Sequence, residues 1–103
     1  MRRWNGWGDD SISYPLIGNA LEFLSEKIGE ATPLPDATLH EVVDRVPPSR
    51  LPEHPSITKS AEERVRHARG QSLPDWLALR TGNLGVFPDG VAYPTSTGDV
   101  RDL

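Results

Sequence analysis

The fold of this chain depends on the stretch SAEERVRHARGQSLPDWLALRTG, residues 60–82, which contains two helix-start signals in succession. In the first, Ser60 stands three residues before Glu63, the spacing of a capping box, in which each side chain accepts a hydrogen bond from the other residue's backbone N–H. This signal predicts a short helix over 60–69 that ends at Gly70. Its apolar residues are few, namely Ala61, Val65 and Ala68. We therefore expect a mostly solvated helix, or one whose charges pair with groups outside this segment.

The second helix-start signal is Ser72–Asp75. Pro74 falls in the first helical turn, where its missing N–H would have had no partner in any case. The signal predicts a helix over 73–81, and Gly82 is typical of a C-terminal stop. The apolar surface of this helix comes from Trp76, Leu77 and Leu79.

Two more helices are predicted upstream of this stretch. Residues 19–28 repeat apolar side chains at three- and four-residue steps, the period of an amphipathic helix. These side chains are Ala20, Leu21, Phe23, Leu24 and Ile28. Thr38 and Glu41 form another capping-box pair, and they predict a helix over 38–46 that Pro47-Pro48 terminates.

The remaining segments are expected to be mostly extended. Residues 47–58 are rich in proline and show no periodicity, which predicts a connector laid over a surface. Residues 86–87 and 91–93 flank the turn sequence Pro88–Gly90, which predicts a short strand or hairpin. Residues 96–99 then have the spacing of a further capping box, followed by about one turn of helix.

The sequence therefore predicts a mainly α fold with about four short helices, followed by a short strand or hairpin. We assign residues 1–85 to a helical N-terminal segment, and the pattern changes over residues 86–103. An isolated turn of helix is unstable, and a chain of 103 residues buries only about 65% of its unfolded surface. We expect, for these reasons, that the chain is the N-terminal portion of a longer protein.

Composition excludes several classes of protein. The net charge is −4, with 11 Lys and Arg against 15 Asp and Glu, so binding to duplex nucleic acid is not expected. No apolar run approaches the about 20 residues of a membrane span. Arg2-Arg3 is followed by WNGWGDD and not by an apolar segment, which argues against an export signal. We expect a cytoplasmic protein.

No residue of the sequence is predicted to be catalytic, to bind a cofactor or to bind a metal. The chain has no cysteine, and none of His40, His54 and His67 has the second histidine that a zinc-binding helix would place at i+4. Glu62 and Glu63 are adjacent on a helix and so do not share a face, which disfavours an acid–base pair. No glycine-rich phosphate loop or serine-nucleophile motif is present.

Two features leave a functional and a structural interpretation open. Arg64, Arg66 and Arg69 form the densest basic cluster, which either lies on a solvated helix face beside the glutamates or holds an anionic ligand. Trp4 and Trp7 either anchor the N-terminus against the rest of the protein or form an aromatic wall over a pocket.

Three stretches carry a resemblance to a known family. They are RWNGWG at residues 3–8, RHARGQSLPDWLALRTG at 66–82, and FPDGVAYP at 87–94 followed by Asp99-Val100. Together they resemble the N-terminal region of FAD-linked oxidases, in particular the alkyldihydroxyacetonephosphate synthase (alkylglycerone-phosphate synthase) branch. The WNGWG motif is the most specific of the three, and residues 30–60 contribute little.

The resemblance implies that the intact protein is a flavoenzyme, either an FAD-dependent oxidoreductase or a synthase of this branch. In the synthase, the flavin activates an acylated dihydroxyacetone phosphate, and an alkyl chain replaces the acyl group without net redox change. The resemblance places the FAD-binding loop beyond residue 103, so residues 86–103 would begin the FAD domain. It also implies that this segment is a structural cap without activity, whose partner is the remainder of its own polypeptide. Arg66 and Arg69 would then face the flavin or an anionic substrate.

Two alternatives remain at this stage. The chain could be a free-standing helical module for interaction or homodimerisation, since short helices with apolar stripes can pair with a second copy. It could also be a small enzyme in its own right, with Arg64, Arg66, His67 and Arg69 as its only convergent polar groups.

Overall fold

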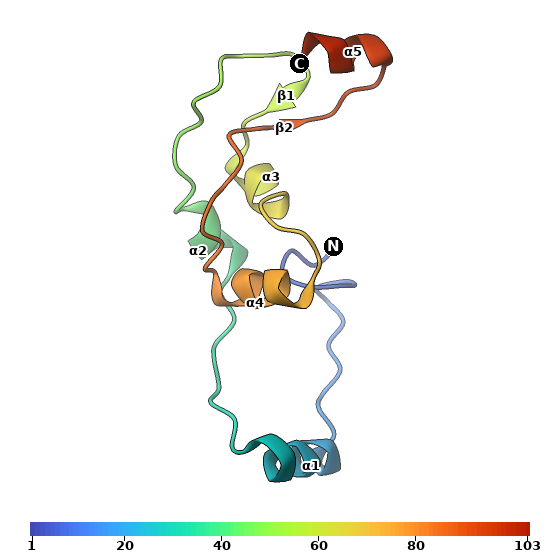
Figure 1. The fold of residues 1–103 in the computed structure, drawn as a ribbon, viewed down its shortest axis with the longest axis vertical. Helices are drawn as coiled ribbons and strands as arrows, with labels where there is room; N and C mark the ends of the chain where they lie inside the picture. The colour runs from blue at the N-terminus through green and yellow to red at the C-terminus, as the bar shows by residue number, and fades with distance from the viewer.

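Seven short elements make up the fold, and the computed structural model describes all residues from 1 to 103 (Figure 1). They are α1 (Gly18–Ile28), α2 (Leu39–Val43), β1 (Ile57–Thr58), α3 (Ala61–Arg66), α4 (Leu73–Thr81), β2 (Val91–Ala92) and α5 (Thr97–Asp102). The prediction of a mainly α chain is thereby confirmed. None of these helices has the length and apolar content that crossing a membrane would require.

The chain is elongated, with principal extents of 56 × 26 × 23 Å. Its radius of gyration is 17.9 Å, against about 13 Å for a compact domain of this length. The excess comes from α1, which lies at one end of the molecule on two extended segments (Figure 1). One of these segments is fixed to α4 where Arg80 pairs with Asp36, at 2.8 and 2.9 Å between guanidinium nitrogens and carboxylate oxygens.

Helix α1 has the predicted bounds to within one residue, but it contributes nothing to the core. None of its residues is buried. Its apolar side chains remain between 43% exposed at Leu21 and 79% exposed at Ile28. The amphipathic pattern is therefore confirmed as a helix and leaves an apolar face without a partner in this chain.

A small core lies where α2, α3, α4 and the segment after α4 meet. Its fully packed members are Val42, Val65, Leu79 and Leu84. Around them pack partly buried side chains, among which Trp4, Trp76 and Phe87 are the largest. Since a buried side chain of this size contributes about 1.5–3 kcal/mol, this cluster supplies most of the apolar stabilisation of the chain.

The ends of the helices follow local signals, with two differences. The predicted capping boxes at Thr38, Ser72 and Ser96 are formed. At Gly82 the backbone adopts φ +70°, the left-handed conformation predicted for a C-terminal stop. Helix α2 is shorter than the predicted 38–46, because the N–H groups of Arg45 and Val46 bond to carbonyls three residues earlier and so tighten the chain into turns.

Helix α3 contradicts the sequence prediction in two ways. It spans Ala61–Arg66 and not 60–69, and Ser60 makes no side-chain capping bond. The Ser60 N–H instead donates to Oγ1 of Thr58, and the carboxylate of Glu63 accepts from the hydroxyl of Tyr93. Of the two environments expected for this helix, the second is found. Val65 is fully buried, Arg64 is only 3% exposed, and charged side chains of the helix bond groups outside it.

Residues 91–92 form the short strand that was one of the two predicted alternatives, whereas a hairpin between residues 86–87 and 91–93 does not form. Strand β2 pairs in antiparallel fashion with β1, with Ile57 opposite Ala92 and Thr58 opposite Val91. The proline-rich connector thus ends in a strand. Its pairing with β2 closes a loop, with 34 residues between Ile57 and Ala92, and local turn sequences do not reveal a contact of this range.

Candidate functional site: an arginine-lined pocket

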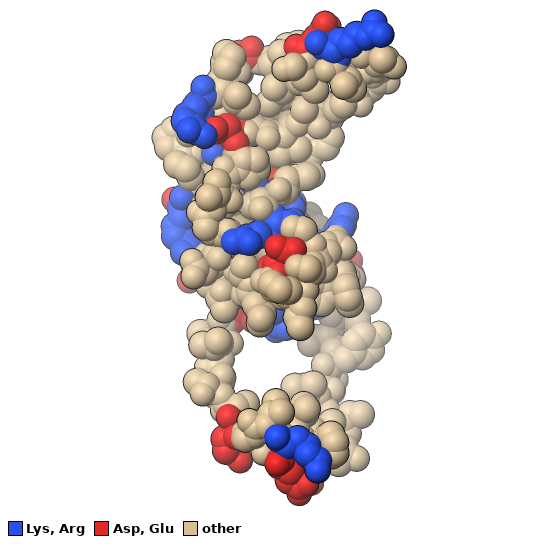
Figure 2. Space-filling view, in the orientation of Figure 1, with Lys and Arg blue, Asp and Glu red and all other residues tan.

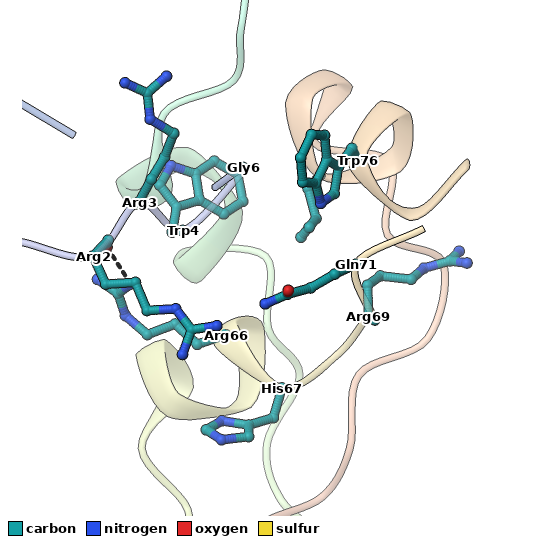
Figure 3. A pocket seen from close by; sticks show the side chains of 11 residues that line it. Arg2, Arg3, Trp4, Gly6, Arg66, His67, Arg69, Gln71 and Trp76 are labelled. Atoms are coloured by element: carbon teal, nitrogen blue, oxygen red, sulfur yellow. Dashed lines mark hydrogen bonds between the residues drawn. The ribbon is translucent and has the colours of Figure 1, made fainter. Parts of the chain in front are cut away.

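A pocket of about 410 Å³ lies between the N-terminal segment, the end of α3 and the start of α4 (Figure 3). Its lining residues are Arg2, Arg3, Trp4, Gly6, Arg66, His67, Arg69, Gly70, Gln71, Trp76 and Leu79. Cations and aromatic rings dominate this lining, which is unusual in a chain of net charge −4.

The N-terminal wall of the pocket is a tight turn of the chain around WNGWG. The backbone N–H of Arg3 donates to the carbonyl of Gly8 at 2.9 Å. The backbones of Arg2 and Asp9 form an isolated antiparallel β-bridge. Gly8 has φ +82°, which permits this reversal. The guanidinium of Arg3 then donates to the carbonyls of Asp9 and Ile12, at 3.2 and 2.5 Å, and secures the turn.

The two tryptophans of this motif have different environments. Trp4 is half-buried, packs against the core and lines the pocket. Trp7 is 67% exposed, and its ring meets Trp76 edge-to-face with centroids 3.8 Å apart. The anchoring and the aromatic-wall interpretations therefore both apply to Trp4. Trp7 lies outside the core and outside this pocket, and it lines a separate pocket beside Arg3, Tyr14 and Arg80.

Arg64 is the member of the basic cluster that lies outside the pocket. Its Nη1 donates to the carbonyl of Pro47 at 2.8 Å and its Nε to the carbonyl of Pro88 at 2.6 Å. The interpretation of Arg64 as a solvated charge beside the glutamates is wrong, since the side chain joins two segments inside the molecule.

Arg66 and Arg69 line the pocket, but both guanidinium groups are held by this chain. Arg66 donates to Glu62 at 2.9 Å and to the carbonyl of Arg2 at 3.3 Å. Arg69 donates from Nε and Nη2 to the carbonyl of Leu84, at 2.9 and 2.6 Å, and its guanidinium points away from the pocket (Figure 3). The sequence left two interpretations open for both residues, pairing with the glutamates or binding of an anion. Arg66 does pair with Glu62, whereas Arg69 bonds to a backbone carbonyl.

Arg2 and Gln71 are the polar residues that sequence reasoning missed. In Figure 3 the two side chains point toward one another across the pocket, with the rings of Trp4 and Trp76 beside them. Arg2 stands next to Arg3 in the sequence. The pair was considered there only as part of an export signal, which the residues that follow it argue against. Both residues precede a short turn, and nothing local shows that the two turns face each other.

His67 lies at the edge of the pocket and makes contacts of its own. Its Nδ1 is 2.8 Å from the carbonyl oxygen of Glu63, and its ring meets Tyr93 edge-to-face at 6.0 Å. The Tyr93 hydroxyl donates to the Glu63 carboxylate, and this bond to a negative partner raises the pKa of Tyr93. His40 and His54 lie elsewhere, the former beside Asp44 and the latter accepting from the Ser56 N–H.

Positive charge outweighs negative charge around the pocket. Four guanidinium groups line it, and the carboxylates that pair with them are those of Glu62 and, at 3.8 Å from Arg69, Asp75. Figure 2 shows the charged groups scattered over the body, with acidic groups beside several of the basic ones. The local excess of cations favours an anionic occupant.

A scan against known protein families found no match to this chain, and a search of solved structures found no significant match.

Proposed function

We propose that residues 1–103 form the N-terminal structural segment of an FAD-dependent flavoenzyme, an oxidoreductase or an enzyme of the alkyldihydroxyacetonephosphate synthase type. The segment would have no activity by itself. The motifs at residues 3–8, 66–82 and 87–100 support the family assignment. The role of the segment rests on one structural observation, the bare apolar face of α1 (Gly18–Ile28).

The exposure of α1 indicates that this helix requires a covering surface. Phe23 is 58% exposed and Leu24 is 45% exposed, on a helix that buries no residue in this chain. An 11-residue helix is marginal in water, because helices of this length gain most of their stability from packing. In the proposed function, the catalytic body of the same polypeptide covers this face.

The cofactor would bind outside this segment. The described residues contain no glycine-rich phosphate loop, so we assign none of them to FAD. The chemistry of the flavin would supply the reaction of the intact enzyme. What residues 1–103 contribute is the shape and the packing surface of a cap.

The first experiment is the visible absorption spectrum of the intact protein. The two absorption bands of oxidised flavin, in the native protein or after reconstitution with FAD, would support the proposal. A colourless protein that takes up no FAD would refute it.

A second experiment tests the cap itself. Leu24→Asp places a charge on the apolar face of α1, and Glu22→Asp is the matched control on the same helix. We expect the first substitution to lower the flavin content and the yield of the intact protein, and the control to leave both unchanged. Equal flavin content in the two variants would contradict the role given to α1.

A second candidate function is a helical interaction or homodimerisation module, which the same exposed face of α1 favours. In this case the occupant would be α1 of a second copy. Light scattering distinguishes the two, since the dimer would dissociate in the Leu24→Asp variant while the protein carries no flavin.

A further inference from the structure

The pocket between the N-terminal turn and the start of α4 contains one guanidinium group that nothing in the chain engages. The backbone carbonyl of Arg2 accepts a bond from Arg66, while the Arg2 side chain makes no hydrogen bond or ion pair. It reaches across the pocket toward the amide of Gln71 (Figure 3). A cation and an amide donor thus converge on the same space.

The neighbouring guanidinium groups are fixed in place. Arg66 is held by the Glu62 carboxylate, and Arg69 is held by the Leu84 carbonyl. The first bond keeps the Arg66 guanidinium close to the pocket, the second directs the Arg69 guanidinium away from it, and neither places a carboxylate opposite Arg2. An anion beside Arg2 would therefore meet a positive potential and would displace no existing ion pair.

The remaining walls of the pocket are aromatic and apolar. Trp4 and Trp76 are both half-buried, and Leu79 is only 6% exposed. Small-molecule sites typically combine such walls with a few convergent polar groups in a volume of about 300–1,000 Å³. The pocket, with its volume of about 410 Å³, has this combination.

We propose that this pocket binds a small molecule that carries a phosphate or carboxylate group on an aromatic or other flat apolar body. The Arg2 guanidinium holds the anion, since its paired N–H groups match two oxygens of either group. The Gln71 amide donates a further bond, and the flat body lies against the indole of Trp4 or Trp76. This inference does not depend on the flavoenzyme proposal and assigns no role to FAD.

The test uses the intact protein and two probes, phenyl phosphate and benzoate, in isothermal titration calorimetry. Benzyl alcohol is the neutral control. We expect saturable binding of at least one anion, with binding of the alcohol too weak to measure. The tighter of the two anions identifies the charged group that the site prefers. Binding of the alcohol as strong as that of both anions would overturn the proposal.

Arg2→Gln removes the charge, and Arg101→Gln on α5 is the matched control, because it makes the same charge change at an exposed position outside the pocket. Arg2→Gln should weaken binding of the preferred anion about tenfold or more, since charge-assisted bonds are lost. Arg101→Gln should change it less than about twofold. Equal affinities in the two variants would overturn the assignment of the site.

Gln71→Glu tests the geometry independently of flavin content or folding. It places a carboxylate opposite Arg2, which would occupy the anion position from within the chain. We expect Gln71→Glu to weaken binding of the anion far more than Gln71→Leu, which removes the amide without adding charge. If Gln71→Leu weakens binding as much as Gln71→Glu, the site does not recognise the anion through Arg2.

Discussion

Arg64 donates from Nε to the carbonyl oxygen of Pro88 at 2.6 Å, although 24 residues separate the two in the sequence. A second bond from the same guanidinium reaches the carbonyl of Pro47. The side chain, which is 3% exposed, therefore joins α3 to both the proline-rich connector and the turn before β2. No carboxylate pairs with it, so its bonds to these carbonyls offset part of the desolvation of its charge, while its Nη2 is buried without a hydrogen-bond partner.

Replacement of Arg64 by Met should be among the most destabilising substitutions in the chain. It removes two hydrogen bonds from a charged donor, each worth about 1.5–3 kcal/mol, and leaves the carbonyls of Pro47 and Pro88 without a partner. We expect the free energy of unfolding to fall by about 3–5 kcal/mol, as measured by urea denaturation. Arg101→Met, at an exposed site on α5, should change it by less than about 0.5 kcal/mol. A similar small effect at both positions would show that Arg64 is not a structural link.

The N-caps of α3 and α4 provide a matched pair of serines. Ser72 accepts a bond from the N–H of Asp75, whereas Ser60 makes no such side-chain bond. Ser72→Ala should therefore cost about 1 kcal/mol of stability, and Ser60→Ala should cost only a few tenths. Urea denaturation of both variants provides the comparison. Equal losses would mean that the Ser60 capping box, absent in this structure, forms in solution.

How far the sequence predicts this fold depends on the distance over which each signal acts. Helices α1 and α4 have nearly the expected bounds, because the periodicity and the Ser72 cap are local. Strand β2 was predicted, but its partner was not, because its pairing with β1 closes a loop that no turn sequence marks. The Ser60 capping box was also wrong, because Tyr93, 30 residues away from Glu63, engages the carboxylate.

The candidate site shows the same limit. The basic cluster around α3 was recognised, but the burial of Arg64 could not be, since Pro47 and Pro88 come near it only through tertiary packing. Arg2 and Gln71 were missed because each lies in a short turn without periodicity. Their opposition across the pocket depends on how the N-terminal turn docks beside α4, and this docking depends on Trp4 packing against the core.

Trp4 and Trp7 should differ in their effect on stability, in contrast to the equal anchoring roles that their sequence suggests. Trp4→Ala removes an indole packed against the core and should cost about 3 kcal/mol. Trp7→Ala removes a ring that is 67% exposed and loses mainly its edge contact with Trp76, at a cost of about 1 kcal/mol. Thermal unfolding of the two single variants checks this order. A larger loss for Trp7→Ala would place that ring in the core.

Gly82 should not tolerate a side chain. Its φ of +70° is unfavourable for other residues, and an added Cβ would lie 2.7 Å from Nη2 of Arg45 and 2.8 Å from the Cβ of Ala37. Gly82→Ala should therefore destabilise the chain by more than about 1 kcal/mol. Gly18→Ala at the start of α1 meets nothing within 4 Å and should be neutral or stabilising. Urea denaturation of both variants measures the difference, and a neutral Gly82→Ala would contradict the tight contact between α4 and the segment before α2.

The pair of Arg50 and Asp89 should make stability depend on pH in the acid range. Nε and Nη2 of Arg50 donate to the Asp89 carboxylate at 2.9 and 2.6 Å, and these bonds lower the pKa of Asp89 below its usual 3.8. Because the folded pKa lies below the unfolded one, the stabilisation is fully present above about pH 4 and is lost as pH falls through the folded pKa. The urea midpoint should therefore fall on acidification below pH 4, and it should fall less steeply in Asp89→Asn.

Other carboxylates contribute to the same acid dependence, so the comparison must isolate Asp89. The carboxylates whose pKa is also lowered by hydrogen bonds are Asp9, Asp36, Glu41, Asp75 and Asp99. The Asp89→Asn variant retains all of them. It loses the ion pair with Arg50 and, with it, the proton that Asp89 takes up on unfolding. Asp102→Asn makes the same chemical change at the exposed end of α5, away from the connector, and serves as the control. Parallel curves of urea midpoint against pH below pH 4 for Asp89→Asn and Asp102→Asn would contradict the prediction, because the carboxylate of Asp89 would then be as free in the folded chain as in the unfolded one. In that case the side-chain bonds between the connector and the turn before β2 would be those of Arg64 and Ser49.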